Sequence, residues 1–467
     1  MSLSALSALE VSGQQVSVPC IDGSERRYVN LDNAATTPPL MEVAETVAKF
    51  TNWYSSVHRG TGFKSQLSSV VFDEARRIIG DFVGVDWETQ TLIFCQHTTE
   101  AVNRLSRRIL LEPSDLILNT VIEHHANLIP WSQTGQVVHV ELENEGMGPG
   151  LDLDGFERLL REYAGRVKLL AVTGASNMTG YMPPIHDLAE LAHRYGALIF
   201  VDGAQLLPHR PVDLRATGDP GHIDFLAFSG HKMYAPYGVG GLVAPKDVLA
   251  QGTPFMLGGG AVRAVRLDDV LWGDLPEREE AGTPNLVGIV ALARSCQVLS
   301  GVGMDVVAEH ERELTRHALI RLQQVPGLTL FGDSDPELGR DRVAVFSFML
   351  RDYSHAHLAA ILGNEYAIAV RNGCFCAHPY VKRLAGVDDE ADARMWLKVA
   401  GGDNSDLPGF VRASAGCYTK QEDFDALAEA LIRIAEKGPA VIYHEDRATG
   451  EYLPVGYSHN FGDYFTL

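Results

Sequence analysis

The sequence is poor in cysteine, in long apolar runs and in positive charge. Its 467 residues include only six cysteines, which stand at positions 20, 95, 296, 374, 376 and 417. They are too few and too scattered for a disulfide framework in a chain of this size. Their spacing does not complete a zinc-binding pattern with nearby histidines, so we expect no metal site. No apolar run approaches the roughly 18 residues of a membrane span, so we expect no membrane partner.

Positive charge is in the minority, with 39 Lys and Arg against 60 Asp and Glu, a net charge of −21. This balance argues against nucleic acid or an anionic membrane surface as a partner. The hydrophobic share of 46% and the charged share of 21% are ordinary for a soluble globular protein. The length predicts two or three domains. The first ten residues lack the basic segment of a signal peptide, so we expect a cytoplasmic protein.

Apolar strand patterns alternate with helical patterns through the first 300 residues. Short apolar runs at 168–172, 197–201 and 223–228 are separated by segments with helical spacing. This alternation is typical of a parallel sheet that is buried on both faces. We therefore predict an α/β fold with a large, mostly parallel sheet of about seven strands, and a ligand site at the carboxyl ends of the strands.

The pattern changes near residue 300, where a long helix is predicted over 305–324 and an α+β mixture follows, with one strand over 367–370. We expect four parts: an N-terminal arm (1–30), a large domain (31–300), a smaller α+β domain (301–440) and a tail (441–467). We predict no helix, strand or function for the charged stretch 387–408. The tail shows no clear hydrophobic periodicity.

A lysine directly after one of these strands is the strongest candidate for chemistry. Lys232 follows the apolar run Ile223–Phe228 in the order Ser-Gly-His-Lys. Poor hydration beside a buried strand lowers the pKa of an amine and makes it a nucleophile. Taken alone, such a lysine is more often an ordinary surface residue. Ser229, His231 and the glycines after Tyr237 are suited to a phosphate-bearing cofactor that lies against the backbone.

Other polar residues also follow predicted strands. Thr98 or Thr99 is expected to cap a helix, and the start of that helix is a potential anion site. His124 is a candidate to stack on an aromatic ring and to move protons, although histidines in such places are usually core or surface residues. Asp202, at the end of the strand Ala197–Val201, could keep a pyridine nitrogen protonated, with helix capping as the alternative.

Two further segments carry candidate residues. A helix is predicted to open near Thr283, with Pro284 at an early helical position. The loop after Arg371 carries Cys374 and Cys376. A nucleophilic thiol should be partly exposed on a mobile loop near cations, which fits Cys376, although a free cysteine is more often inert core. If the loop is extended, both cysteine side chains point the same way.

Several short motifs occur in one order between about residues 28 and 437. They read D-N-A-A-T-T-P, H-R-G, T-T-E-A, E-H-H-A-N, S-N, V-D-G-A-Q, F-S-G-H-K, E-A-G-T-P-N, R-N-G-C-F-C-A and V-R-A-S. As an ordered set they closely resemble the group II cysteine desulfurases and selenocysteine lyases. These are pyridoxal-phosphate (PLP) enzymes of aminotransferase class V with the fold-type I architecture.

The resemblance implies a homodimeric PLP enzyme that converts L-cysteine to L-alanine. It implies that sulfur passes to a loop cysteine as a persulfide and then to a sulfur-acceptor protein. Lys232 would hold PLP and remove the Cα proton, His124 would stack on the ring, and Cys376 would take the sulfur. Asp202 would pair with the ring nitrogen and Gln205 with the ring oxygen.

The resemblance also implies two sets of binding residues. The phosphate ligands would be Thr98, Thr99, Ser229 and His231, with Thr283 from a second subunit. The substrate ligands would be Asn33, Ala34, His58, Asn177, Arg371 and Arg412, with the arginines placed to bind a carboxylate bidentately.

The Cys-Phe-Cys order of the loop resembles more closely the desulfurase domain of molybdenum-cofactor sulfurases, which leaves the sulfur acceptor open. Two other functions remain as alternatives. A class V C–S lyase acting on a cysteine conjugate, or an epimerase, needs Lys232 and Asp202 but no loop thiol. A non-catalytic protein of the PLP fold needs neither Lys232, nor Asp202, nor the loop thiol.

Overall fold

A seven-stranded sheet is the largest unit of the computed structural model, which describes residues 6, 9–143, 150–337, 341–405 and 407–467. The strand order is β4-β12-β11-β10-β9-β5-β6, and within this sheet β12 alone runs antiparallel to its neighbours. The strands are β4 (Gln90–Cys95), β5 (Leu116–Thr120), β6 (Gln136–Val140), β9 (Val167–Thr173), β10 (Leu198–Asp202), β11 (Phe225–Ser229) and β12 (Gly240–Pro245). The predicted α/β class and the mostly parallel sheet are confirmed.

Helices cover both faces of this sheet because alternate residues of each strand point to opposite sides. Leu92 of β4 belongs to one core and its neighbour Ile93 to the other. The first core also takes residues from α2 (Met41–Thr51), α3 (Phe63–Val83), α6 (Leu153–Glu162), α7 (Ile185–Arg194) and α9 (Leu286–Val302). The second core takes residues from α4 (Thr98–Leu105), α5 (Ile129–Thr134) and α8 (Lys246–Ala250). We call this sheet with its helices the large unit.

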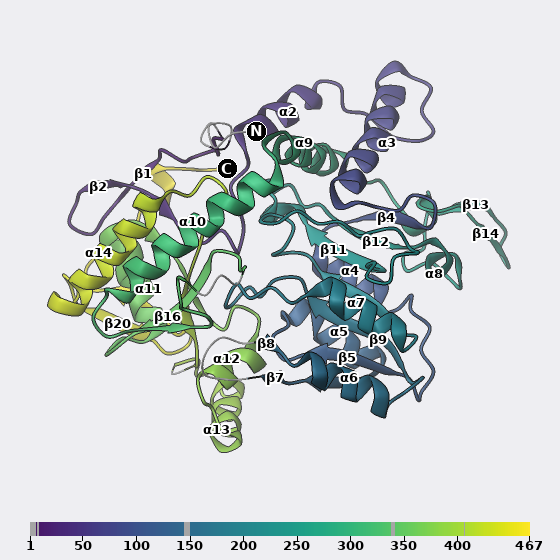
Figure 1. The fold of residues 1–467 in the computed structure, drawn as a ribbon. Helices are drawn as coiled ribbons and strands as arrows, with labels where there is room; N and C mark the ends of the chain where they lie inside the picture. The colour runs from purple at the N-terminus through teal and green to yellow at the C-terminus, as the bar shows by residue number, and fades with distance from the viewer. Residues whose placement is uncertain (1–5, 7–8, 144–149, 338–340, 406) are drawn as a thin grey trace.

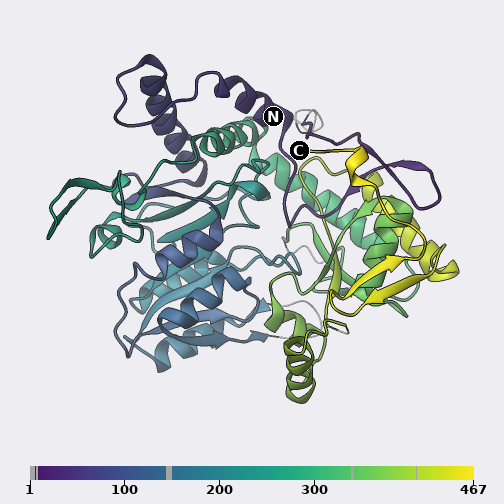
Figure 2. The ribbon, with the colours of Figure 1, turned by 180° about the vertical axis from the view of Figure 1, so that it is seen from behind.

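A smaller antiparallel sheet, in the order β15-β16-β19-β18, forms the second unit (Figures 1 and 2). Its strands are β15 (Leu328–Phe331), β16 (Val345–Leu350), β18 (Arg371–Gly373) and β19 (Phe410–Ser414). Residues of α10 (Met304–Gln323), α11 (His355–Tyr366) and α14 (Gln421–Lys437) fill the same core. Val29 belongs to this core too, because β3 (Val29–Asn30) pairs with β17 (Ile368–Ala369).

The structure corrects several sequence expectations. The strand predicted over 367–370 divides: β17 pairs with β3, and β18 begins only at Arg371 in the small sheet. Pro284 lies outside the helix it was expected to open, because α9 begins at Leu286 with Asn285 as its cap. The stretch 387–408 contains α13 (Asp389–Ala400), described except for residue 406. None of the α13 side chains is buried, although the helix carries Trp396, Leu397 and Val399.

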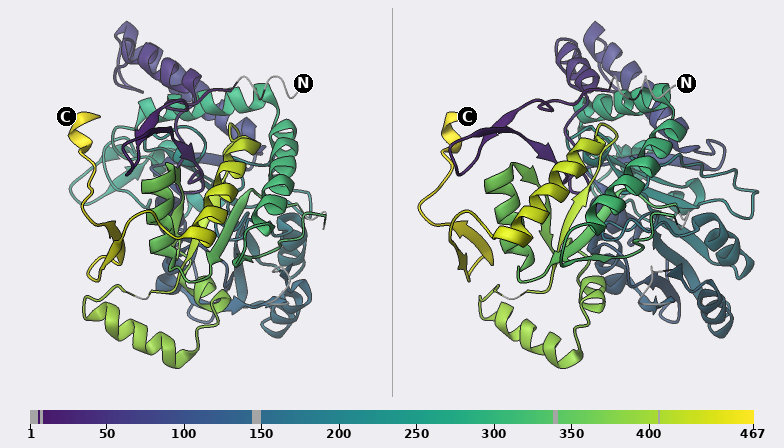
Figure 3. Two further views of the ribbon diagram at one scale, coloured as in Figure 1. Left: turned by 90° about the vertical axis from the view of Figure 1, so that its left-hand side faces the viewer. Right: turned by 60° about the vertical axis from the view of Figure 1, so that its left-hand side comes forward.

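The remaining short elements lie at the periphery. After the thiol-bearing loop comes α12 (His378–Leu384), and α13 then extends away from the small unit (Figure 3). The tail forms the hairpin of β20 (Tyr443–Asp446) and β21 (Glu451–Pro454), which packs on α11. Other hairpins are β1 (Ser17–Pro19) with β2 (Glu25–Arg27), β7 (Leu142–Glu143) with β8 (Gly150–Leu151), and β13 (Val262–Val265) with β14 (Val270–Trp272). No single helix in the described ranges is long and apolar enough to cross a membrane. Helices α9 and α10 reach that length and apolar content only when taken together, and this pair is bent by 76°.

Candidate active site

A cavity of about 400 Å³ lies where the two units meet. It receives residues from the carboxyl ends of β10 and β11, from the start of α4, and from β18, β19 and the loop before α12. Most of the residues singled out in the sequence line it: Ala34, Thr98, Thr99, His124, Asn177, Asp202, Gln205, Ser229, His231, Lys232, Arg371, Cys376 and Arg412.

Lys232 reaches the cavity because β11 ends at Ser229 and a 3-10 turn, Gly230–Lys232, follows directly. Desolvation lowers the pKa of its amine to about 8, with a smaller contribution in the same direction from the Arg412 cation. Asp202 and Cys376 act in the opposite direction. A pKa near neutrality leaves part of the lysine population as the free, nucleophilic amine.

The start of α4 forms a polar corner of the cavity beside Ser229. The backbone N–H of Thr98 donates to Ser229 Oγ at 2.9 Å, and the two hydroxyl oxygens lie 2.8 Å apart. The expectation that a threonine caps this helix is wrong, because His97 Nδ1 accepts from the backbone N–H of Glu100 at 3.1 Å. With His97 as the cap, both threonines belong to the first turn, and the start of a helix suits an anion.

Two side chains of the large unit, His124 and Asp202, are suited to a planar heterocycle. Burial lowers the pKa of His124 to about 3, with further lowering by Lys232, so its ring is neutral; its Nδ1 accepts from the Ala126 N–H at 3.0 Å. Burial raises the pKa of Asp202, and its Oδ1 accepts from the Ala204 N–H at 3.0 Å. A cation beside this carboxyl would reverse the shift, because opposite charge favours ionisation.

The two arginines face one carboxylate that the sequence analysis left without a role. Arg371 Nη2 lies 3.0 Å from Asp32 Oδ2, and Arg412 Nη2 lies 3.4 Å from Asp32 Oδ1. Burial lowers the pKa of Arg412 to about 10, and Arg412 Nη1 donates to the Asn177 carbonyl at 3.0 Å. Asp32 thus pairs with both arginines.

Residues 374–378, which we call the thiol loop, are not extended. Phe375 and Cys376 have φ angles of 49° and 55°, in the left-handed region that costs a non-glycine residue about 1–2 kcal/mol. The expectation that both cysteines point the same way is therefore wrong. Cys376 is exposed and lines the cavity, whereas Cys374 Sγ donates to the Pro408 carbonyl at 2.8 Å. Burial raises the pKa of the Cys374 thiol to about 11.

Three predicted site residues lie outside the cavity lining. The Asn33 amide donates to the carbonyls of Asn30 and Ser414, which is a structural role. His58 has a φ of 70° and sets its ring edge-on against that of Phe72, with the centroids 5.1 Å apart. Thr283 lies just before α9 and does not line the cavity of its own chain.

Sequence reasoning also missed residues that shape the site. Besides Asp32 and His97, these include Phe375, whose ring lies under the Arg412 guanidinium at 4.8 Å. The buried Glu123 is another: desolvation raises the pKa of its carboxyl to about 8, and it accepts from Asn127 Nδ2 at 2.7 Å. Glu123 and Asn127 both stand in the motif Glu-His-His-Ala-Asn, but only the fold shows that their side chains are hydrogen-bonded to each other.

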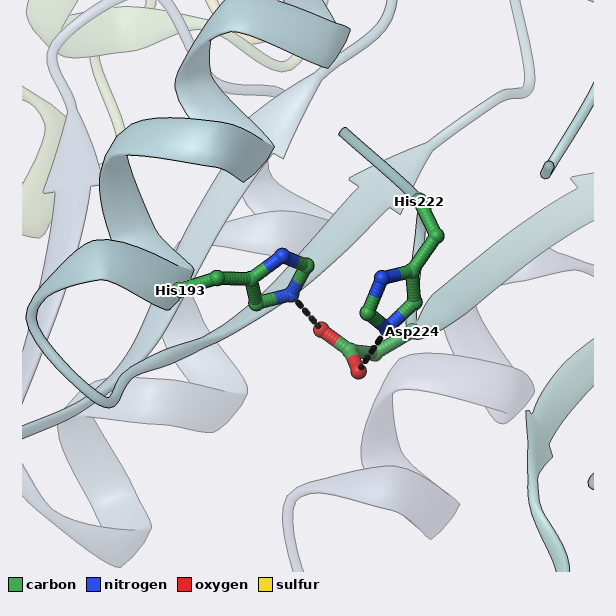
Figure 4. A group of neighbouring side chains, drawn as sticks. All are labelled: His193, His222 and Asp224. Carbon is green, nitrogen blue, oxygen red and sulfur yellow. Dashed lines mark hydrogen bonds and ion pairs between the residues drawn. The ribbon is translucent and has the colours of Figure 1, made fainter. Parts of the chain in front are cut away.

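A cluster of histidine and aspartate lies at the opposite end of β10 and β11 (Figure 4). His193 Nε2 and His222 Nε2 face the two oxygens of Asp224 at 2.9 and 3.2 Å. The two rings are stacked, with planes 18° apart, so no single ion could lie in the plane of both rings. Hydrogen bonding to Asp224 raises the pKa of His222, as expected of an ion pair. Asp224 also accepts from the Ile199 N–H at 2.8 Å, which ties the cluster to the start of strand β10.

A second cavity, of about 620 Å³, lies between the N-terminal arm and the start of α14. Its charged residues include Arg27 and Asp423, which already pair with each other at 2.6 Å. As described in the structure, its lining includes neither histidine nor cysteine. Of these two cavities, the one around Lys232 carries the amine, thiol and imidazole groups that chemistry requires.

Comparison with known proteins shows the family of the chain. The family model for aminotransferase class-V matches residues 29–427, which is most of the chain. The chain belongs to the aminotransferase class-V family. Members of this family use pyridoxal phosphate, which is therefore the cofactor of this protein.

Several relatives are named as cysteine desulfurases. One, from Haloferax volcanii, is 33% identical over 88% of this chain and 90% of its own length. Another, from Escherichia coli, is 32% identical over 86% of this chain and 92% of its own. The apo structure of a cysteine desulfurase from Thermococcus onnurineus is 28% identical and superposes with a TM-score of 0.76, covering 88% of this chain and 95% of that one.

The residues of the cavity fit the cofactor. Gln205 Oε1 is buried and has no hydrogen-bond partner among the described residues, although its Nε2 donates to the Ala34 carbonyl at 2.6 Å. An orphaned buried acceptor is costly, so a polar ligand is expected beside it. The amine of Lys232, the carboxyl of Asp202 and the polar corner at Thr98 match the aldehyde, the ring nitrogen and the phosphate of PLP.

Proposed function

We propose that the protein is a cysteine desulfurase that converts L-cysteine to L-alanine and forms a persulfide on Cys376. The observation that carries the proposal is that an amine, Lys232, and an exposed thiol, Cys376, line the same cavity. A lyase or an epimerase requires the amine but has no use for the thiol.

The reaction balances with these groups alone. The Cβ–S bond of the substrate breaks, an S–S bond forms at Cys376 Sγ, and the substrate carbon skeleton gains the protons that yield alanine. PLP supplies an electron sink for the substrate Cα. The Lys232 amine, with its lowered pKa, moves the Cα proton. The ionised Asp202 carboxylate would keep the ring nitrogen protonated, and the neutral His124 would cover one ring face.

The arginines would orient the substrate. Arg371 and Arg412 now share Asp32, and the bond from Arg412 to Asp32 is long at 3.4 Å. A substrate carboxylate would compete for these guanidinium groups and gain charge-assisted hydrogen bonds. Asn177, whose carbonyl holds Arg412, would fix the orientation of that guanidinium.

The test is the product formed from L-cysteine. Purified protein incubated with L-cysteine and a reductant is expected to release alanine and sulfide in equal amounts. Pyruvate and ammonia as the main products would instead establish the C–S lyase alternative, because elimination without a thiol acceptor ends in pyruvate.

We further propose a cytoplasmic homodimer in which residues 31–300 bind PLP and residues 301–440 carry the thiol. A persulfide carrier requires reduced thiols, which the cytoplasm maintains, and all six cysteines are free. Thr283 would reach the phosphate of the partner's cofactor, since it does not line its own cavity.

The dimer is tested by Thr283→Ala. Sedimentation is expected to show a twofold dimer at working concentration, the commonest oligomer of soluble proteins. The variant is expected to remain dimeric but to bind PLP about tenfold more weakly, the effect of one lost hydrogen bond to a charged group. An active monomer, or unchanged PLP affinity, would contradict the shared site.

A further inference from the structure

One residue of the large unit, His125, fastens the thiol loop at two points. The backbone N–H of His125 donates to the Cys376 carbonyl at 2.7 Å. The Nε2 atom of the same residue accepts from the backbone N–H of His378 at 3.2 Å. The imidazole rings of His125 and His378 also meet edge-on, with their centroids 4.6 Å apart. The two hydrogen bonds lie on either side of the 376–378 segment that bears the thiol.

The loop conformation depends on such contacts. Phe375 and Cys376 are consecutive non-glycine residues with positive φ angles, a backbone that persists only where surrounding structure holds it. A third contact comes from Asn177, whose side-chain Nδ2 donates to the Phe375 carbonyl at 2.7 Å. His125 and Asn177 both belong to the large unit, so the loop is held against the cavity from outside its own unit.

We propose that His125 is a positioning residue that docks the thiol loop against the cavity and releases it when its imidazole is protonated. The inference rests on the proposed function, in which Cys376 collects sulfur inside the cavity. A thiol that must also hand sulfur to an acceptor has to leave the cavity, so the contacts that dock it must be breakable.

The chemistry of imidazole makes the docking dependent on protonation. Nε2 can accept from the His378 N–H only in the neutral ring with its proton on Nδ1. A protonated ring would present an N–H to an N–H and would lose the bond. The ionisable groups that face His125 are the ring of His378 and the ring of His124; Lys382 and Asp392 act on His378.

The direction of the pH effect follows. Desolvation, reinforced by His378, lowers the pKa of His125 below its ordinary value of about 6.5. The docked loop therefore holds the neutral ring at pH 7. The neutral His125 ring therefore stabilises the docked loop fully at pH values above its ordinary pKa of about 6.5. This stabilisation is lost as the pH falls from about 6.5 towards the lowered pKa of His125.

Two substitutions separate the hydrogen bond from the bulk of the ring. His125→Gln places an amide oxygen near the position of Nε2 and keeps an acceptor that does not titrate. His125→Phe keeps a flat ring without an acceptor. The measurement is the rate at which iodoacetamide labels Cys376 in PLP-loaded protein without substrate, between about pH 5.5 and 8. Tandem mass spectrometry distinguishes label on Cys376 from label on Cys374.

At pH 7 the Phe variant is expected to label about tenfold faster than the parent, the factor that corresponds to one hydrogen bond. The Gln variant should match the parent at pH 7. The ratio of the parent rate to the Gln rate should rise as the pH falls, and this ratio cancels the ionisation of the thiol itself. His378→Ala retains the backbone N–H and is the matched control, expected within about twofold of the parent.

A second measurement reports on function. Persulfide formation on Cys376 after addition of L-cysteine should be slower in the Phe variant and restored in the Gln variant, while the PLP absorbance change with L-cysteine stays the same in both. Restoration by Gln is a result that a purely structural role of the ring would not give.

Equal labelling rates in the parent, Phe and Gln proteins at every pH would overturn the proposal. If the Phe variant fails to fold, a parent-to-Gln ratio that does not change with pH overturns it equally. A parent protein that never forms a persulfide on Cys376 would instead contradict the proposed function and leave the labelling result to stand.

Discussion

Cys376→Ala is expected to lose alanine formation by at least about 10³-fold while it binds PLP normally. The nucleophile that takes the sulfur is removed, and losses of this order are typical when a catalytic nucleophile is deleted. The cofactor is held by other residues, so its absorbance and its spectral response to L-cysteine should persist. The measurements are alanine release and the absorbance spectrum of the purified variant.

Cys374→Ala is the matched control, two residues away in the same loop. Its thiol donates to the Pro408 carbonyl and has a raised pKa, so this variant should keep most of the turnover. If Cys376→Ala formed alanine at the parent rate, sulfur transfer to this thiol would be disproved. If it formed pyruvate instead, PLP-driven elimination would be the activity.

Lys232→Arg is expected to abolish turnover, by about 10²–10⁴-fold for loss of the base alone and further for loss of the covalent anchor. The guanidinium keeps the positive charge but neither forms the link to PLP nor accepts a proton at neutral pH. Borohydride treatment should fix PLP to a peptide containing Lys232 in the parent and to no peptide in the variant.

Lys49→Ala is the control for this experiment. Lys49 is an exposed lysine on α2 that pairs only loosely with Glu45, at 3.6 Å. The control should retain colour, covalent PLP and turnover. A parent protein in which borohydride fixed PLP to another lysine would remove Lys232 from the mechanism.

The elements around the cofactor site were predictable because they depend on local periodicity. Apolar runs separated by helical patterns predicted the parallel sheet, and parallel strands end at one common edge. Asp202 and Lys232 each follow such a strand, so the strand pattern alone indicates that they meet at one edge of the sheet. The order of motifs added the family and its cofactor.

The contacts between distant segments were not predictable in this way. Asp32 belongs to the first of the ordered motifs, but nothing near it in the chain indicates that it pairs with Arg371 and Arg412. Asn33 and His58 belong to the family motifs and yet lie outside the cavity lining. The Asn33 side chain is hydrogen-bonded elsewhere, and the His58 ring packs against another ring. Helix α13 was missed because its apolar residues, among them Trp396, Leu397 and Val399, stand in a stretch of charged residues and none of them is buried.

By itself, the sequence determined the fold class, through strand periodicity, and the cofactor, through the ordered motifs that resemble a known family. It also predicted the Lys232 amine as the nucleophile, from its place after a strand. Only the tertiary structure decided which loop cysteine reaches the cavity. Phe375 and Cys376 take left-handed backbone angles that their own residue types disfavour, and contacts from Asn177 and His125, some 200 and 250 positions earlier in the chain, hold them there. Local preferences cannot encode a conformation whose stabilising partners lie so far away in sequence.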